Sequence, residues 1–511
     1  MSERAAKPGR TGAGTPGATA PAAPAQLDAG LLNPLGHGSR EAELTSDAAW
    51  LRAMVDTELA LTGALVDAGL APDWMLPVCD SLAGGSRYDL AAIAAEGRGG
   101  GNPVIPLVKH LAAAADSVRA GATDHIHVGA TSQDILDTAA MLIAHRVTGE
   151  VGAQLAALAD TLAELADEHR VTVMAGRTLG QQASPTSFGF VAAGWLDAVL
   201  SILERLDRVR DTLPVQLGGA VGTLAVLTEV AGSRRPDASA AQVVDGVVLG
   251  LASRLGLAAP GIAWHTNRLV IAELASVLAA ATGVVGSFAL DVTVLSRTEI
   301  AEVTERLGQG EGGSSAMPHK RNPVTAVLVT AAARQTPFLL ATLYGSLLAE
   351  DQRPSGAWHA EWQALRALER LTVSAVTGAA SLAGRLDIDR ERMRANLDLT
   401  DGLVFSERLT TMLAEALGKT AAFDLVELAS GESLATNRPL QVVLSGFLSS
   451  EGRDEKLRAQ IWDAFEYDSD LGQAAAGIGR VLTRHRARSA SAIEVTDDTD
   501  GPADTARTHS R

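Results

Sequence analysis

The chain has 511 residues, of which 47% are hydrophobic and 4% aromatic, so it can bury a large core and is not a disordered protein. Its formal net charge of −17 excludes a general nucleic-acid surface, because binding to phosphates requires a basic face. Cys79 is the single cysteine, which excludes intramolecular disulfides and favours a reducing, cytoplasmic location.

The two ends of the chain differ in composition from the rest. Residues 1–30 contain 18 Ala, Pro or Gly residues, and residues 485–511 have Ile493 and Val495 as their large apolar residues. Segments of this kind bury too little apolar surface to offset the entropy of ordering. We therefore expect disordered extensions at 1–30 and 485–511 and a folded part over 31–484.

The folded part begins with helical patterns. Asp47 to Gly69 is predicted to be a first helix, with Thr45 or Ser46 as its cap and Pro72 beyond its end. Residues 97–106 are rich in glycine and proline and are expected to be a connection. We expect a helical N-terminal domain over 31–124.

Longer helical patterns follow. Apolar residues recur at alternating spacings of three and four, as in Val151, Leu155, Leu158, Leu162 and Leu165. Such spacing places one apolar stripe on a helix that packs in a bundle. The stretch from Leu274 to Leu290 is uncharged but short and contains two glycines, which favours a buried bundle helix over a membrane span.

The same patterns set the expected domain division. We predict an all-α protein with a central long-helix bundle over 125–375 and, after a break at Leu386, a helical C-terminal domain over 376–484.

Two polar segments precede apolar helical patterns. In HVGATSQDILDT, residues 127–138, Thr131 and Ser132 are suited to bind an anion at a helix start, although the segment taken alone favours an ordinary helix cap. In GRTLGQQASPTSFG, residues 176–189, Thr178 and Gln181 lie close together in a polar segment that could contribute to a functional site. The alternative is that this segment is a plain loop. His125 and His127 lack a partner set of ligands, so we expect no metal site.

A third segment is richer in glycine. Gly308, Gly310, Gly312 and Gly313 precede SSAMPHKRNP, a run that combines small residues with a basic cluster. This pattern fits a mobile lid that closes over an anion, and a flexible surface loop is the alternative.

The run GSSAMPHKRNP, residues 313–323, resembles the signature loop of the fumarase/aspartase superfamily. The two earlier segments stand in the order of that superfamily. The resemblance implies a three-domain helical fold, a homotetramer whose sites each combine loops from three subunits, a small polycarboxylate substrate, and catalysis without a metal or organic cofactor.

The resemblance also implies roles for individual residues. Ser314 would be the general base that removes a proton next to a carboxylate, with Lys320 as its catalytic partner. A further set would bind substrate: His127, Thr131, Ser132, Thr178, Gln181, Asn322 and, as weaker candidates, Arg353 and His359. Basic groups and hydrogen-bond donors suit this chemistry, because proton removal creates a dianionic aci-carboxylate.

One departure from the superfamily pattern concerns the leaving group. Several amine- or water-releasing members carry histidine after the threonine of the second segment, whereas this chain has Leu179 after Thr178. Leucine cannot donate a proton, and a carboxylate can leave without one, because carboxylic acids have a pKa of about 4. The missing acid therefore indicates a carboxylate leaving group.

That chemistry, together with segments such as GNPVIPLVK, WHTNR and GAWHAEW, resembles the 3-carboxy-cis,cis-muconate cycloisomerase family. The resemblance implies interconversion of 3-carboxy-cis,cis-muconate and 4-carboxymuconolactone in protocatechuate degradation by the β-ketoadipate pathway. Two alternatives are an amine-releasing lyase similar to adenylosuccinate lyase and a non-catalytic helical structural homologue.

Overall fold

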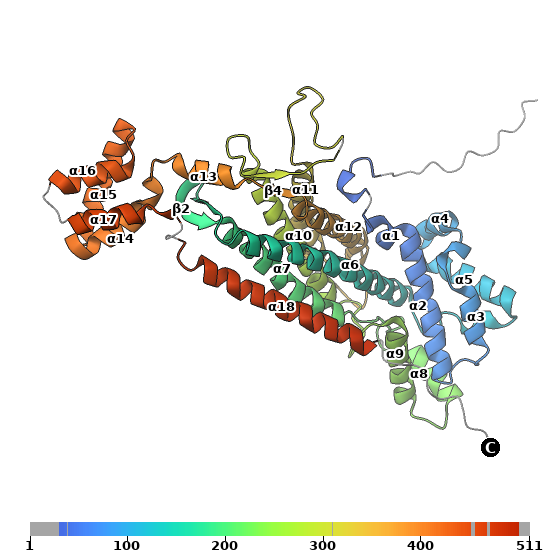
Figure 1. Cartoon of the computed structure of the whole chain (residues 1–511). Helices are drawn as coiled ribbons and strands as arrows, with labels where there is room; N and C mark the ends of the chain where they lie inside the picture. Colours follow the sequence, from blue (N-terminus) through green and yellow to red (C-terminus); the bar gives the residue numbers. More distant parts are fainter. Residues whose placement is uncertain (1–29, 38, 309, 451–454, 468–470, 500–511) are drawn as a thin grey trace, which may run out of the picture.

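The structure is a computed structural model that describes residues 30–37, 39–308, 310–450, 455–467 and 471–499. The expected extension over residues 1–29 lies outside this range. The described chain is largely helical, which confirms the predicted all-α class (Figure 1).

The N-terminal part consists of short helices around one long helix. The long helix α2 spans Asp47–Asp67 and begins at Ser46, whose hydroxyl accepts a hydrogen bond from the Ala49 N–H at 3.2 Å, as predicted for a helix cap. The accompanying helices are α1 (Glu41–Thr45), α3 (Met75–Leu82), α4 (Leu90–Gly100) and α5 (Val104–Val118), with 3₁₀ turns η1 (Pro34–Gly36), η2 (Gly85–Arg87) and η3 (Ala122–His125). The expected connection over 97–106 is shorter than predicted, because α4 continues to Gly100 and α5 begins at Val104.

A bundle of long helices forms the middle of the molecule. Its members are α6 (Ser132–Glu168), α7 (Phe188–Asp211), α10 (Leu269–Leu295), α11 (Val324–Gly345) and α12 (Ala357–Ala383). Helix α9 (Ala240–Leu255) packs on α2, and α8 (Ala225–Arg234) packs on α9. The stripe predicted on α6 is buried, since Leu155, Leu158 and Leu162 are each 0% exposed. Figure 1 shows α6 running from α2 to the hairpin at the other end of the bundle.

Two small antiparallel sheets cap that other end. Strands β1 (Val173–Thr178) and β2 (Gln181–Ser187) form a hairpin between α6 and α7, and β3 (Val303–Glu305) pairs with β4 (Leu386–Ile388). The second polar segment is therefore a β-hairpin, not a plain loop. Its turn residues Leu179 and Gly180 have φ values of 52° and 82°, the backbone that a tight hairpin turn requires.

The C-terminal helices have a hydrophobic cluster of their own. They are α13 (Arg390–Asp398), η4 (Leu403–Phe405), α14 (Ser406–Leu417), α15 (Lys419–Thr436), α16 (Leu440–Ser450) and α17 (Glu455–Ala464). Phe405, Leu409, Leu413 and Leu444 are buried in this cluster, which is distinct from the bundle core.

The last helix corrects an expectation about the tail. Helix α18 spans Ala474–Thr499 and packs on α7 and α6, so the expected disorder does not begin at His485. The polar residues of this helix find acidic partners on the bundle: His485 contacts Asp160 at 2.8 Å and Arg488 donates to Asp207 at 2.8 Å. Residues 500–511 lie outside the described range.

Two bundle helices are long and apolar enough to cross a membrane. In the most apolar window of α10, 56% of the residues are buried inside the protein, as predicted for a bundle helix. The corresponding share for α11 is 22%, and Val327 and Phe338 on this helix are 48% and 76% exposed. Helix α11 thus presents an apolar face that one chain leaves uncovered.

Candidate active site

The first polar segment forms a helix start that is suited to bind an anion. Thr131 caps α6 in a capping box with Asp134, whose carboxylate accepts the Thr131 N–H at 2.9 Å. Asp134 also accepts from the backbone of Gly218 and Gly219 and contacts Nε2 of buried His265 at 2.7 Å. The first N–H groups of α6 have no partner within the helix, so this end attracts a carboxylate.

Arg353, one of the weaker candidates for substrate binding, lies at this helix start. Its Nε donates to Oε1 of Gln133 at 2.8 Å, and its Nη2 donates to Oγ1 of Thr131 at 3.1 Å. The guanidinium is about half-buried and forms no ion pair among the described residues. Arg353 therefore supplies positive charge beside Thr131 with its orientation fixed.

A network of buried charged residues lies next to Gln133 and Arg353. Arg268 is 2% exposed and donates to both oxygens of Asp137 at 2.7 and 3.1 Å and to both oxygens of Glu361 at 3.0 and 2.6 Å. Gln133 donates to Asp137 at 3.1 Å, so the network reaches the group that holds Arg353. One guanidinium that is hydrogen-bonded to two buried carboxylates fixes the geometry of both.

His127 is paired with a buried carboxylate. Its Nδ1 lies 2.7 Å from Oε1 of Glu58, a residue on α2 that is 0% exposed. Burial acts to lower the pKa of His127, but the hydrogen bond and charge of Glu58 and the charge of Asp134 outweigh it, so the pKa is raised. With Nδ1–H donated to Glu58, the imidazolium offers Nε2–H as a charged donor.

Ser132 and His359 also lie near the start of α6. Asn102 donates to the Ser132 hydroxyl at 3.4 Å, and His359 stands near the adjacent Gly101. The His359 ring packs against the ring of Trp362, with centroids 4.7 Å apart. The structure thus gathers five predicted site residues in one half-site: His127, Thr131, Ser132, Arg353 and His359.

The second segment lies elsewhere, at the tip of the β1–β2 hairpin. Thr178 and Gln181 are exposed there, and Leu179 between them is 103% exposed. The hairpin is anchored close to its turn, because Arg177, which pairs with Gln182 in the hairpin, donates to buried Glu302 through two hydrogen bonds of 2.6 and 2.9 Å. A rigid hairpin therefore carries an uncovered tip.

The third segment is a loop between β3 and α11 whose base is closed by Asn322. The Asn322 backbone N–H and side-chain Nδ2 donate to the Gly312 carbonyl at 3.0 and 3.2 Å. A Cβ on Gly312 would lie 2.9 Å from the Asn322 backbone carbonyl oxygen, and the φ of Gly312 is 66°, so glycine is strongly favoured there. Asn322, predicted to bind substrate, holds the loop together in this structure.

Ser314 and Lys320 lie on the outer part of this loop. The Ser314 hydroxyl oxygen accepts hydrogen bonds from the backbone N–H groups of Ala316 at 3.3 Å and Met317 at 3.2 Å. Two donated hydrogen bonds stabilise a serine oxyanion, the form that acts as a base. Lys320 is exposed and makes no ion pair with a described residue.

One chain cannot bring the three segments together. The half-site precedes α6 and the hairpin follows it, and a helix of 37 residues is about 54 Å long. The loop with Ser314 lies at the hairpin end, because Arg177 pairs with Glu302 directly before β3. The half-site and Ser314 therefore lie at opposite ends of the bundle in one chain.

The sequence predicted no metal site at His125 and His127. Within the described residues, no group of three or more His, Cys, Asp or Glu side chains is arranged to hold a metal ion. The ring of His125 instead packs edge-on against Trp74, with centroids 5.4 Å apart.

Sequence reasoning missed several residues that build the half-site. Glu58, Asp134 and His265 were not singled out, although the WHTNR segment contains His265 and Arg268. The sequence contains little indication of Glu58 and Asp134, because an acidic residue within an apolar helical pattern usually occupies a solvent-facing position. Burial alone separates them from the other acidic residues of the chain.

Comparisons with known proteins identify the family of this chain. The family model described as lyase matches residues 42–337. A nitrosuccinate lyase from Streptomyces davaonensis is 45% identical over 421 residues, which cover 82% of this chain and 88% of that protein. A 3-carboxy-cis,cis-muconate cycloisomerase from Pseudomonas aeruginosa is 39% identical over 445 residues, which cover 86% and 93%.

Solved structures give the same assignment. The cycloisomerase from Acinetobacter calcoaceticus sp. ADP1 superposes with a TM-score of 0.78 at 34% identity, covering 87% of this chain and 97% of that one. The lactonizing enzyme from Pseudomonas putida gives a TM-score of 0.77 at 35% identity over 87% and 96%. The chain therefore belongs to the lyase family of the fumarase/aspartase superfamily, as its signature loop predicted.

Proposed function

We propose that the chain is a cytoplasmic cycloisomerase that interconverts 3-carboxy-cis,cis-muconate and 4-carboxymuconolactone in protocatechuate degradation. The observation that carries the anionic leaving group of this proposal is Leu179, fully exposed at the hairpin tip where related lyases place a proton donor. A carboxylate that leaves as a stable anion needs no such donor. Relatives with this activity at 36–39% identity support the choice of substrate.

In the forward direction, one carboxylate oxygen of the substrate adds to a carbon–carbon double bond conjugated with another carboxylate. The electron pair moves onto that second carboxylate, and the resulting aci-carboxylate takes a proton from Ser314. In reverse, Ser314 removes the same proton and the ring oxygen departs as a carboxylate. Arg353 and the start of α6 bind one substrate carboxylate, and Lys320 another.

His127 adds a charged donor to this scheme. With Nδ1–H held by Glu58, its Nε2–H hydrogen-bonds the substrate carboxylate on which negative charge develops. The arrangement supplies positive charge in the half-site even though position 179 is leucine.

The proposal requires a homotetramer in which each site combines the half-site, a hairpin tip and a Ser314 loop from three different subunits. The separation of these elements by the length of α6 supports it, as do the uncovered apolar face of α11 and the exposed Leu179.

Subunit mixing tests directly whether sites are shared between subunits. Arg353→Ala and Ser314→Ala, each inactive alone, should regain about a quarter of wild-type activity after joint refolding, because one arrangement in four restores a complete site. No recovery would contradict shared sites.

Nitrosuccinate is the second candidate substrate, favoured by the relative at 45% identity. Loss of a proton and nitrite from nitrosuccinate gives fumarate, and nitrite is also a stable anion, so Leu179 suits both reactions. The two proposals share Ser314 as the base and differ in the leaving group.

One experiment separates these functions. Purified protein is given 3-carboxy-cis,cis-muconate while the diene absorbance is followed, and nitrosuccinate while nitrite is measured. Adenylosuccinate serves as the amine-releasing control. Rapid loss of the diene supports the cycloisomerase, nitrite release with an unchanged diene moves the assignment to nitrosuccinate, and cleavage of adenylosuccinate alone overturns the argument from Leu179.

A further inference from the structure

Arg353 in the half-site is held by three uncharged acceptors. Its Nε donates to Oε1 of Gln133 at 2.8 Å, and its Nη2 donates to the Thr131 hydroxyl at 3.1 Å and, more weakly, to the Ala220 carbonyl at 3.5 Å. Its Nη1 has no partner among the described residues and is accessible to solvent. The guanidinium is therefore fixed in orientation while its positive charge is left for a ligand.

Arg268, in the neighbouring buried network, is bound differently. Asp137 and Glu361 pair with it at 2.7 and 2.6 Å, so two carboxylates neutralise its charge inside the protein. Of these two arginines, one is thus neutralised by carboxylates and the other is held without any.

The side-chain amide of Gln133 lies between the two arginines. Gln133 is 0% exposed, and its Nε2 donates to Oδ2 of Asp137 at 3.1 Å and to the His265 carbonyl at 2.9 Å. Both of these partners can only accept a hydrogen bond and Arg353 can only donate one, so the network fixes which end of the amide carries the oxygen. The amide therefore separates anionic Asp137 from cationic Arg353 and neutralises neither.

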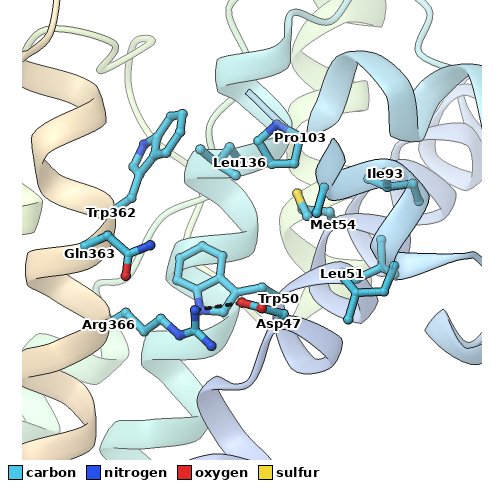
Figure 2. Close-up of a pocket in the computed structure, with 12 residues that line it drawn as sticks. Asp47, Trp50, Leu51, Met54, Ile93, Pro103, Leu136, Trp362, Gln363 and Arg366 are labelled. Atoms are coloured by element: carbon cyan, nitrogen blue, oxygen red, sulfur yellow. Dashed lines mark hydrogen bonds and ion pairs between the residues drawn. The ribbon is translucent and has the colours of Figure 1, made fainter. Parts of the chain in front are cut away.

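The backbone that carries Gln133 is fixed by packing between helices. Gln133 is in the first turn of α6, and Trp358 of α12 donates to Asp137, one turn later, at 2.9 Å. Leu136 of α6 and Trp362 of α12 line one cavity of about 210 Å³ beside this contact, as Figure 2 shows. A residue on packed helices is held more precisely than one on a loop, so Gln133 is suited to orient a neighbouring guanidinium.

We propose that Gln133 is a positioning residue that keeps Arg353 oriented and unneutralised, and that it thereby sets the affinity of the half-site for a substrate carboxylate. A glutamate at this position would pair with Arg353 and repel Asp137, and an apolar residue would leave the Arg353 Nε without an acceptor. The inference rests on the proposed function only in requiring a carboxylate in the half-site, and both 3-carboxy-cis,cis-muconate and nitrosuccinate carry one.

The test uses propane-1,2,3-tricarboxylate as an unreactive probe, because it has three carboxylates but no double bond and no leaving group. Its binding to the full-length protein is measured by ligand-observed NMR at pH 7.5. This measurement needs no turnover, so it gives a result even if both proposed reactions fail.

Two substitutions at Gln133 distinguish charge from shape. Gln133→Glu should weaken probe binding about tenfold or more, because the new carboxylate neutralises Arg353. Gln133→Met keeps the length of the side chain without adding charge and should weaken binding about threefold. Gln242→Glu, at an exposed position of α9, adds the same charge elsewhere and should have no effect.

Two further measurements separate positioning from a general loss of structure. In an Arg353→Ala background, Gln133→Glu should no longer weaken probe binding, because its effect acts through the Arg353 charge. With whichever substrate turns over, Gln133→Glu should raise KM about tenfold and change kcat less than about twofold, since the carboxylate is bound alike in the ground and transition states.

Four results would overturn the proposal. They are absence of saturable probe binding to wild type, equal weakening by Gln133→Met and Gln133→Glu, a Gln133→Glu effect that persists in Arg353→Ala, and a fall in kcat with unchanged KM. If light scattering shows that Gln133→Glu does not assemble, Gln133→Met decides the question, since its effect should also vanish in Arg353→Ala.

Discussion

Glu369 is a carboxyl group whose ionisation should control the stability of the bundle. It lies on α12, is 0% exposed, and both of its carboxyl oxygens lack a hydrogen-bond partner among the described residues. Burial raises the pKa of Glu369 to about 8, and the charge of Arg366 opposes this only in part. The folded chain therefore holds Glu369 protonated at neutral pH.

The sign of the pH effect follows from the two pKa values. Below about pH 4.5 both folded and unfolded chains bind this proton, so Glu369 causes no loss of stability. Between about pH 4.5 and 8 the unfolded chain releases the proton and the folded chain keeps it, so stability falls as pH rises. A gap of about 3.5 pH units at about 1.36 kcal/mol per unit gives at most about 5 kcal/mol per chain.

Glu369→Gln removes the ionisable proton with little change in shape. We expect its free energy of unfolding to match wild type within about 1 kcal/mol at pH 5 and to exceed it by several kcal/mol at pH 8. Urea titrations followed by circular dichroism at pH 5, 6.5 and 8, at one protein concentration, measure this difference. Glu427→Gln, at an exposed position of α15, is the matched control and should change nothing. A variant less stable than wild type at pH 8 would show that Glu369 is ionised and paired, which would refute the reasoning.

Four further predictions concern the active site. Ser314→Ala should reduce turnover at least about a thousandfold with assembly unchanged by light scattering, and full residual activity would remove Ser314 as the base. Leu179→His should leave cycloisomerisation the same or slower, so a large rate gain in the diene assay would contradict the leaving-group argument. Glu58→Gln should lower the pKa of His127, so that activity falls at a lower pH than in wild type; an unchanged pH–rate profile would separate Glu58 from catalysis. Arg353→Lys should raise KM roughly tenfold because lysine cannot hold both Gln133 and Thr131 in one plane, and an unchanged KM would exclude Arg353 from substrate binding.

The amino-acid sequence by itself determined the helical class, the helix at Asp47, the α6 stripe and the signature loop. These features are local: helical periodicity and capping depend on residues three or four apart, and the loop is one continuous run. The family assignment rested on this loop and holds in the comparisons.

The hairpin around Leu179 is a feature that local sequence did not predict. Its strands are short, and β2 is polar and interrupted by Pro185, so the intrinsic preference of β2 for β structure is low. Contacts from outside hold it, namely Arg177 with Glu302 and Gln182 with the Asn396 carbonyl. Tertiary contacts therefore form the hairpin despite the low β propensity of its residues.

The composition of the half-site was also decided only by tertiary structure. His127 meets Glu58 across 69 residues of sequence, and Asp134 meets His265 across 131. Pairing between buried charges depends on which helices pack together, and that information is not contained in any short window of sequence. The length of α6 likewise places Thr131 and Ser314 at opposite ends of the helical bundle within one chain. A helix of fixed rise per residue cannot fold back to bring them together.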